Sequence, residues 1–412
     1  MSELPEPADP SRYGLDTEHL RRAGDYLGRY IDGGVLAGWQ LVVARGGAVV
    51  WHERRGLADI EAGTRVRPDT LWRLRSMTKP VTAVAAMMLY EAGEFALDDP
   101  VGRWLPEFAS PRVYQFGPPQ RPGTTPSPEP IRVRHLLTHT AGLSYEFHHV
   151  HPVDALYRAA EDEPGWANAD LAARCRRWAS IPLLYVPDTG WTYSVASDVL
   201  GRLVEVVSGQ RLDDYFTQRI FGPLGMTDTG FWADGERAAR LATAYRRDPA
   251  DGKLVRDDAE TAQGTRPPAF LSGGGGLVGS AADYHRFTQF LVRRGELDGV
   301  RLLGARTVDL MFRNHLRGGA SYTALQPAPP SWPPAPGLGF GLGLAVVTDP
   351  AAAGTPACAG TGFWSGALNT EFFVDPADDL VALFFTQLTP YGAVPLQREL
   401  AQLVCTALTP RR

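Results

Sequence analysis

Apolar residues recur at helical spacing in some stretches of the chain and alternate with polar residues in others. The helical spacing predicts six helices, over Thr17–Tyr30, 81–90, Asp170–Ala179, Val195–Val207, Ala281–Arg293 and Leu396–Leu408. The alternation predicts five strands, over Trp39–Ala44, Ala48–Glu53, Gly341–Val347, Asn369–Val374 and Leu380–Thr386. Because these strands lie near the two ends of the chain, we expect them to form one sheet with the middle of the chain inserted between them.

The middle of the chain has a different pattern. Residues Ser110–Pro130 are rich in Pro, Gly and Gln, which predicts a long surface loop, and from Val133 to about Phe231 most periodic segments are helical. We therefore expect an α+β fold, an α/β sheet with a helical insertion. Its predicted parts are a tail over residues 1–14, a sheet domain over 15–105 and 268–412, and a mostly helical inserted domain over 106–267.

Composition and charge narrow the class of protein. With 412 residues and 44% hydrophobic content, the chain can bury a large core. A net charge of −5 and dispersed basic residues argue against a nucleic-acid partner, and the lack of a long uncharged apolar run argues against a membrane span. The acidic, proline-rich start has no secretion-signal pattern. Cys175, Cys358 and Cys405 are odd in number and lack metal-ligand spacing, so we expect packing roles and a cytoplasmic location.

The pair Ser76 and Lys79 provides the first candidate chemistry. The two residues stand three apart where the helix over 81–90, expected to be amphipathic, begins, so both side chains can lie on one face. A serine becomes a nucleophile when a neighbouring base takes its proton, and a buried lysine can be that base. The same spacing also arises from an N-cap serine and a solvated lysine, so the pair needs support from elsewhere in the chain.

Two further segments supply that support. Tyr193 lies between an irregular stretch and the helix over Val195–Val207, where its phenol can point into a cleft and relay a proton. The segment Gly362–Ala367 leads into a strand, and its small residues would allow backbone N–H groups to approach a substrate carbonyl. Each segment also has a purely structural interpretation. Tyr193 can be an aromatic residue packed at a helix start, and Gly362–Ala367 can be an ordinary turn before a strand.

Five motifs then occur in the order found in the serine β-lactamases and penicillin-binding proteins. They are Ser76-Met77-Thr78-Lys79, His135-Leu136-Leu137-Thr138-His139-Thr140-Ala141-Gly142-Leu143, Tyr193-Ser194-Val195-Ala196-Ser197-Asp198-Val199-Leu200-Gly201, Gly273-Gly274-Gly275-Gly276-Leu277 and Trp364-Ser365-Gly366. From about Leu15 to Leu408 the chain resembles the class C β-lactamase-related esterases, called family VIII carboxylesterases, and a fungal statin-side-chain acyltransferase. The resemblance implies an antiparallel sheet flanked by helices, a mostly helical subdomain and no cofactor.

The resemblance also implies roles for single residues. Ser76 would be the nucleophile that accepts the acyl group, Lys79 its base and Tyr193 the proton shuttle. The backbone N–H groups of Ser76 and Ala367 would form the oxyanion hole. Substrate-binding residues would be Tyr145, Trp364, Ser365 and Gly366, with the aromatic segments Tyr114-Gln115-Phe116 and Ser331-Trp332-Pro333-Pro334 either lining an acyl or alcohol pocket or packing as loops.

Two positions depart from the lactamase pattern. Trp364-Ser365-Gly366 stands where the lactamases have Lys-Thr-Gly, and Val195 stands where their Tyr-x-Asn motif has asparagine. An indole cannot bind a β-lactam carboxylate as a lysine cation does. Both departures favour neutral esters over anionic β-lactams.

Other alignments and site classes fit less well. Ser197-Asp198-Val199 resembles the Ser-Asp-Asn motif of class A enzymes but lacks its asparagine and falls inside a predicted helix, so Tyr193 is preferred. No Gly-x-Ser-x-Gly elbow of α/β-hydrolases is present. His135 and His139, and the group His148, His149 and His151, lack a zinc-protease pattern, so no metal site is expected.

The sequence therefore predicts a serine hydrolase that cleaves short to medium carboxylic esters through an acyl–Ser76 intermediate, with a small-molecule ester as its partner. The alternatives left open are an acyltransferase using the same intermediate, a β-lactamase or D-aminopeptidase-type amidase, and a penicillin-recognising sensor that is acylated without turnover. The natural substrate and the oligomeric state do not follow from the sequence.

Overall fold

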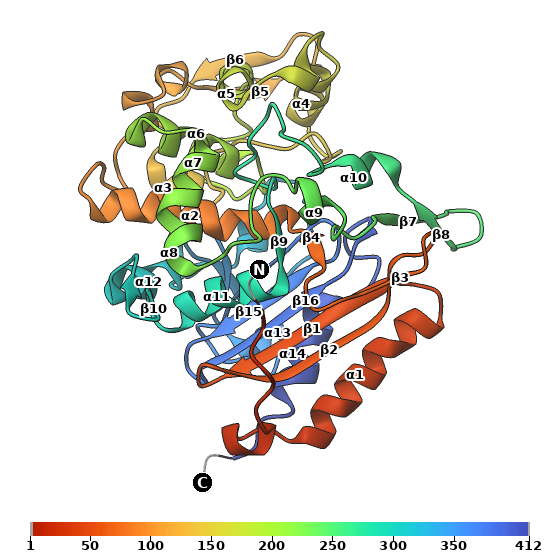
Figure 1. Cartoon of the computed structure of the whole chain (residues 1–412). Helices are drawn as coiled ribbons and strands as arrows, with labels where there is room; N and C mark the ends of the chain where they lie inside the picture. The colour runs from red at the N-terminus through yellow and green to blue at the C-terminus, as the bar shows by residue number, and fades with distance from the viewer. Residues whose placement is uncertain (1–2, 411–412) are drawn as a thin grey trace.

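The computed structural model, which describes residues 3–410, is built around one eight-stranded antiparallel sheet (Figure 1). Its strands, in spatial order, are β12 (Leu338–Phe340), β13 (Ala345–Val347), β14 (Gly362–Ser365), β15 (Glu371–Asp375), β16 (Leu380–Phe385), β1 (Gly38–Arg45), β2 (Ala48–Asp59) and β3 (Thr64–Arg65). β1 pairs with β16, so the first and last parts of the chain share one sheet, as the strand pattern predicts.

Helices cover both faces of this sheet. α1 (Thr17–Asp32) begins after Asp16, whose side chain accepts a hydrogen bond from the His19 N–H, and it buries Leu20 and Leu27. α14 (Leu396–Cys405) packs beside α1 and against β15 and β16. α11 (Ala281–Val292) packs against β1, β15 and β16 on the opposite face. The α+β fold class with an antiparallel sheet flanked by helices is confirmed.

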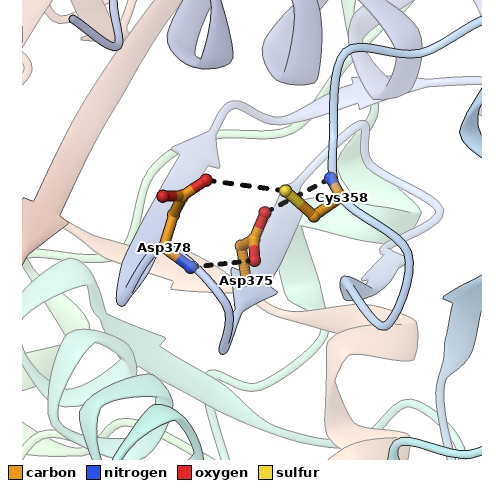
Figure 2. Close-up of side chains that lie close together, drawn as sticks. All are labelled: Cys358, Asp375 and Asp378. Atoms are coloured by element: carbon orange, nitrogen blue, oxygen red, sulfur yellow. Dashed lines mark hydrogen bonds between the residues drawn. The ribbon is translucent and has the colours of Figure 1, made fainter. Parts of the chain in front are cut away.

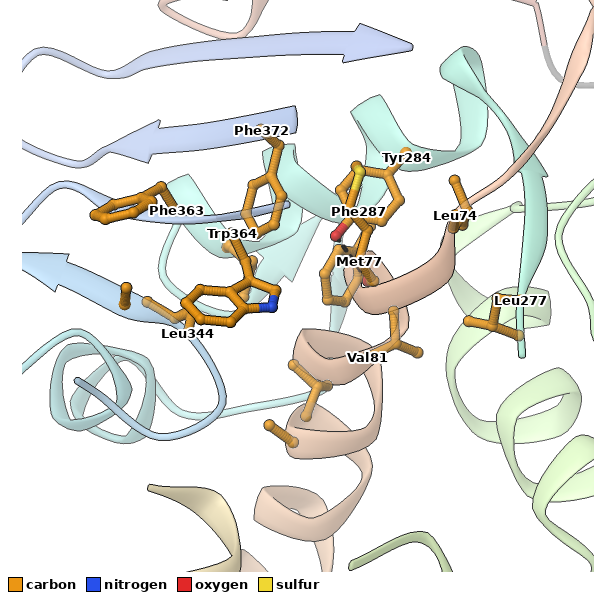
Figure 3. Close-up of a cluster of buried hydrophobic side chains, with 14 of the residues drawn as sticks. Leu74, Met77, Val81, Leu277, Tyr284, Phe287, Leu344, Phe363, Trp364 and Phe372 are labelled. Atoms are coloured by element: carbon orange, nitrogen blue, oxygen red, sulfur yellow. Dashed lines mark hydrogen bonds between the residues drawn. The ribbon is translucent and has the colours of Figure 1, made fainter. Parts of the chain in front are cut away.

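The helix that follows Ser76 is more deeply buried than the sequence predicts. α2 (Thr78–Glu91) was expected to be amphipathic, yet its residues from Thr78 to Met87 are all buried, because α6 (Ala196–Ser208) and the core around Tyr284 and Phe287 enclose it. Figure 3 shows Met77 and Val81 surrounded by hydrophobic side chains at this end of the helix. The polar groups at its start are therefore held in a low-dielectric setting.

The remaining elements are shorter. The other helices are α3 (Val133–Leu137), α4 (Pro152–Glu161), α5 (Leu171–Ala179), α7 (Leu212–Phe216), α8 (Gly222–Leu224), α9 (Gly235–Ala238), α10 (Asp258–Ala262), α12 (Ala305–Met311) and α13 (Pro350–Ala353). The small sheets pair β4 (Leu71–Arg73) with β9 (Val278–Ser280), β5 (Arg112–Phe116) with β6 (Gly123–Pro126), β10 (Glu296–Leu297) with β11 (Val300–Arg301), and β17 (Leu388–Thr389) and β8 (Leu254–Arg256) with β7 (Tyr245–Arg247). Within residues 3–410 no helix is long and apolar enough to span a bilayer.

Two elements differ from the sequence-based predictions. The predicted loop over 110–130 contains the β5–β6 hairpin, whose mostly exposed residues and flanking Pro and Gly obscure the strand pattern. Of the predicted strand Gly341–Val347 only Ala345–Val347 (β13) is a strand, because residues 341–344 form the turn from β12, in which Gly343 has a φ of +91° and Gly341 lies against the Met311 carbonyl. The predicted boundaries at residues 106 and 268 remain a prediction.

Candidate active site

Ser76 lies in a short 3₁₀ turn, Arg75–Met77, that connects β4 to α2. The turn is fixed from several sides, because the Tyr284 hydroxyl donates to the Met77 carbonyl at 2.9 Å and Leu74 N–H donates to the Leu277 carbonyl at 2.9 Å. Arg75 has a φ of 48°, a left-handed conformation that is rare for a non-glycine residue and that is found at functional sites. The surrounding structure thus holds a strained turn that presents Ser76.

The predicted nucleophile, base and shuttle are brought together. The Tyr193 hydroxyl donates to Ser76 Oγ at 2.6 Å, and Lys79 Nζ donates to the same oxygen at 3.1 Å. Tyr193 lies three residues before Ala196, the first residue of α6, and Ser76 and Lys79 lie either side of the first residue of α2. Lys79 is only 2% exposed and Tyr193 is 5% exposed, whereas Ser76 remains partly open. Two groups able to exchange protons therefore converge on one accessible hydroxyl.

The Lys79 side-chain nitrogen is held by a carbonyl and by aromatic rings. Its Nζ donates to the Gly274 carbonyl at 2.7 Å and lies 4.5 Å from the Tyr193 ring centroid and 5.4 Å from that of Tyr145. The Gly274 turn is in turn fixed by Asp198, whose Oδ1 accepts from Gly274 N–H at 3.0 Å and from the Ser272 hydroxyl at 2.6 Å. Burial raises the pKa of Asp198, and Lys79 opposes that shift.

Two histidines position Tyr193. His148 Nε2–H donates to the Tyr193 carbonyl at 2.7 Å, and the His139 ring lies 5.0 Å from the Tyr193 ring. Burial, reinforced by Lys79, lowers the pKa of His139 well below its usual value, so its ring is neutral. Sequence reasoning discounted these histidines as metal ligands and missed this packing role, as it missed Asp198. The place of His139 within the motif His135–Leu143 was the only signal in the sequence that pointed to such a role.

The end of β14 lies against the turn that carries Ser76. A side chain at Gly366 would collide with the Leu74 carbonyl, since its Cβ would lie 2.5 Å from that oxygen and 3.3 Å from Arg75 Cβ. Only glycine allows this close approach. Ala367, which follows, is solvent-exposed. The backbone after β14 is therefore beside the nucleophile, where an N–H group can face a bound carbonyl.

A family model described as beta-lactamase matches residues 25–405 of the chain. The chain belongs to the β-lactamase family. This match covers almost the whole sequence, so both the sheet and the helical part between its strands belong to the family fold.

Relatives in this family include esterases and acyltransferases. Esterase EstB of Burkholderia gladioli is 35% identical over 406 residues, covering 93% of this chain and 94% of that protein. Monacolin J acid methylbutanoyltransferase of Aspergillus terreus is 31% identical, covering 81% of this chain and 80% of that protein. The solved structure of EstCE1, a hydrolase with promiscuous acyltransferase activity, aligns with a TM-score of 0.77 and 29% identity over 95% of this chain and 99% of EstCE1.

Aromatic side chains surround the β-lactamase-family serine. The Trp364 indole N–H donates to the Tyr193 hydroxyl at 3.4 Å, and Trp332 stacks on Trp364 with ring centroids 6.2 Å apart. On the other side Tyr145 lies 5.2 Å from Tyr193 and stacks on Phe147, which is 50% exposed. The predicted residues Trp364 and Tyr145 thus form an aromatic wall around Tyr193, Trp364 with Trp332 on one side and Tyr145 with Phe147 on the other. By contrast, Tyr114 packs on His151 and Phe116 is 71% exposed.

Ser365 differs from the other predicted substrate-binding residues. Successive side chains of a strand point to opposite faces, so Ser365 faces away from Trp364 and Tyr193. Its hydroxyl donates to the Tyr391 hydroxyl at 2.9 Å. Its part in substrate binding stays a prediction. The competing residue Ser197 lies inside α6, as expected, and is buried.

One group of side chains within residues 3–410 has metal-ligating atoms close together, namely Cys358, Asp375 and Asp378 (Figure 2). Sequence spacing did not indicate it, because the fold brings Cys358 to the turn between β15 and β16. Asp375 accepts hydrogen bonds from the backbone N–H groups of Cys358 and Asp378, and Arg45 pairs with Asp378 at 3.2 Å. Burial raises the pKa of the Cys358 thiol to about 11, so it is a protonated donor to Asp378. These contacts stabilise the turn.

Proposed function

We propose that this chain is a carboxylesterase that hydrolyses neutral esters of short to medium acyl chains through a covalent acyl–Ser76 intermediate. The observation that carries the proposal is the convergence of the Tyr193 hydroxyl and Lys79 Nζ on Ser76 Oγ. The 35% sequence identity to esterase EstB supports this proposal. We assign the chain to the family VIII carboxylesterases on the same grounds.

In the acylation step, Ser76 Oγ attacks the ester carbonyl carbon and its proton passes to the Tyr193–Lys79 pair. The carbonyl oxygen becomes an oxyanion, which the backbone N–H groups of Ser76 and Ala367 are proposed to stabilise. When the tetrahedral intermediate collapses, the bond to the leaving alcohol breaks and the alcohol oxygen takes up the proton from Tyr193. The product of this step is an ester between the acyl group and Ser76.

In the deacylation step, a water molecule takes the place of the alcohol. Tyr193 accepts a proton from the water and passes its own hydroxyl proton to Lys79 as the water oxygen attacks the acyl carbon. The protons then move back along the same path, so that Ser76 Oγ is protonated as the acid leaves. Lys79 acts on the same proton path, because it donates to Ser76 Oγ and lies over the Tyr193 ring. This scheme needs no cofactor.

Substrate choice is proposed to follow from Trp364 and Val195. The indole of Trp364 and the buried side chain of Val195 stand where lactamases present a lysine and an asparagine to an anionic lactam. A neutral ester needs neither group and gains from contact with Trp332, Trp364, Tyr145 and Phe147. A β-lactamase or D-aminopeptidase activity is the weaker expectation for this reason.

An acyltransferase is a second candidate, because the aromatic wall offers an apolar place for an acceptor alcohol in competition with water. The 31% identity with monacolin J acid methylbutanoyltransferase favours it as a side activity. A cytoplasmic location stays a prediction that rests on the three cysteines, which are free in the described structure.

The proposed test compares kcat/KM for p-nitrophenyl butyrate with kcat/KM for a chromogenic cephalosporin on one preparation. Loss of the two charge-assisted contacts costs a lactam roughly 1.5–3 kcal/mol each, so the ester value should exceed the lactam value by about 100-fold or more. An equal or larger cephalosporin value would replace the esterase with a lactamase. Release of a single equivalent of p-nitrophenol would indicate a sensor, and faster p-nitrophenol release with an added alcohol would indicate transfer.

A further inference from the structure

An apolar cavity lies on the face of β14 turned away from Ser76. Its volume is about 230 Å³. Its walls come from β12 to β15, α13, α14 and the segment before β12, and they include Leu338, Val347, Phe363, Phe373, Leu400 and Ala401. Ser76, Lys79, Tyr193 and Trp364 are not among the described residues that line it. The cavity is therefore separate from the candidate active site.

The alternation of side chains on β14 places the two sites back to back. Trp364 points to Tyr193, to whose hydroxyl it donates. Phe363 and Ser365, on either side of it, point to the other face, and Phe363 lines the cavity. Figure 3 shows Phe363 and Trp364 leaving the same strand in different directions. One strand thus separates a catalytic face from an apolar cavity.

A buried carboxyl group lines this cavity. Glu371 is 3% exposed, pairs across the strands with Ser365, and is hydrogen-bonded by the hydroxyls of Ser365 and Tyr391. Burial raises the pKa of Glu371 well above its usual value, against the smaller effect of those hydrogen bonds. The neutral carboxylic acid is a hydrogen-bond donor in an otherwise apolar lining. The exposed Arg398 lies at the mouth.

The size and lining set the class of molecule that fits. An apolar cavity of about 150 Å³ binds benzene in another protein, so a larger cavity holds one ring with a short substituent. We propose that this cavity binds a small, mostly apolar molecule with a single carbonyl group, whose oxygen accepts a hydrogen bond from Glu371. Acetophenone is a suitable probe, and ethylbenzene is a matched probe without the acceptor.

Calorimetry with both probes tests the proposal, because the two molecules differ only in that a carbonyl group replaces a methylene group. A net hydrogen bond of 0.5–1.5 kcal/mol corresponds to roughly three- to tenfold tighter binding of acetophenone. Glu371→Leu should remove that preference, since leucine has a similar volume and no donor. Glu371→Gln should keep it, because the amide N–H₂ group donates in place of the acid. Equal binding of the two probes by the unmodified protein would overturn the proposal.

The site of binding is tested by filling the cavity. Ala401→Trp should weaken both probes by more than about tenfold, because the indole would occupy the ligand volume. Gln402→Trp is the matched control, since residue 402 lies on the exposed side of the same helix and should leave binding unchanged. Undiminished binding in Ala401→Trp would show that the probes bind elsewhere and would overturn the proposal. If tryptophan prevents folding, the comparison of Glu371→Leu with Glu371→Gln still decides the outcome.

The cavity proposal can fail without affecting the esterase proposal. Neither probe is an ester, and the readout is binding rather than turnover. If the unmodified protein hydrolyses p-nitrophenyl butyrate but does not bind acetophenone, only the cavity proposal is contradicted.

Discussion

Two serine–tyrosine pairs lie on either side of β14, and they differ in the third group that each contacts. In the first pair the Tyr193 hydroxyl donates to Ser76 at 2.6 Å, and in the second the Ser365 hydroxyl donates to Tyr391 at 2.9 Å. Lys79 joins the first pair, and Glu371 joins the second. The two pairs contain the same two functional groups, with the hydrogen bond running in opposite directions, and each has a different third partner.

The third partner decides what each serine can do. A lysine beside the hydroxyl can take up the serine proton and stabilise negative charge on the tyrosine. Burial raises the pKa of Glu371 well above its usual value and so favours its protonated form, which makes it a poor base. The 3₁₀ turn at Ser76 also leaves that hydroxyl partly open, whereas Ser365 is 8% exposed. Only the first pair is expected to form an acyl-enzyme.

The largest effect is expected from removing the nucleophile. Ser76→Ala should lower p-nitrophenyl butyrate hydrolysis by at least about 10³-fold with an unchanged thermal midpoint, because no other hydroxyl can replace Oγ. Ser365→Ala is the matched control and should retain at least about a tenth of the activity, since it removes a hydroxyl from the other face of the strand. A comparable loss in both variants would remove the distinction between the two pairs.

Removing the proton-transfer groups should have the next largest effect. Lys79→Ala and Tyr193→Phe should each lower kcat by about 10²–10⁴-fold, and the double variant should resemble the worse single variant, because both act on one proton path. Tyr391→Phe is the control for the loss of a buried tyrosine hydroxyl, and its kcat should fall by less than about tenfold. Steady-state kinetics of the four variants measure this, and full activity of Tyr193→Phe would exclude the tyrosine and favour Ser197.

A smaller effect is expected at Asp198. This residue positions Lys79 indirectly, because it fixes the turn at Gly274, whose carbonyl accepts a hydrogen bond from Lys79. Asp198→Asn keeps an acceptor for Ser272 and Gly274 but removes the negative charge near Lys79. We expect kcat to fall by about tenfold, with a shift in its pH profile and little change in KM. A lower thermal midpoint with an unshifted pH profile would give Asp198 a purely structural role.

The smallest effect concerns the pH dependence of stability at Glu371. Its folded pKa lies above the usual value of 4.5, so the folded state binds the proton more tightly, and this group costs stability as the pH rises above the unfolded pKa towards the folded pKa. Glu371→Gln removes the titration. As the pH rises above the unfolded pKa, the variant should therefore gain stability relative to the unmodified protein, by up to about 1.4 kcal/mol per pH unit, until the folded pKa is passed. Urea unfolding at several pH values measures this, and parallel curves would contradict it.

Much of the site could be predicted from the sequence, because its residues lie at element boundaries with fixed spacing. Ser76 and Lys79 are three residues apart at a helix start, and Tyr193 precedes a helix with a clear apolar pattern, so local geometry carried these predictions. The motif order added the position of Trp364, which no local pattern places beside Tyr193. The central strands β1, β2, β15 and β16 were also predicted, since alternation and burial agree there.

The remainder depends on contacts between distant segments. The raised pKa of Glu371 depends on its burial in the cavity beside Ser365 and Tyr391. The hydrogen bonds between Cys358 and the turn after β15 depend on the pairing of β14 with β15. The β5–β6 hairpin was missed because it is short and exposed, so burial does not enforce its alternation. The full burial of α2 was missed because helical periodicity cannot reveal how many sides of a helix are covered.

The central claim, that Ser76 alone carries the acyl-enzyme, is tested most directly by intact-mass and peptide-mass measurement after reaction with a p-nitrophenyl phosphonate. The account predicts a single adduct per chain, located on Ser76, with none in Ser76→Ala and an unchanged adduct in Ser365→Ala. An adduct on Ser365, Ser194 or Ser197 in the unmodified protein would contradict the account.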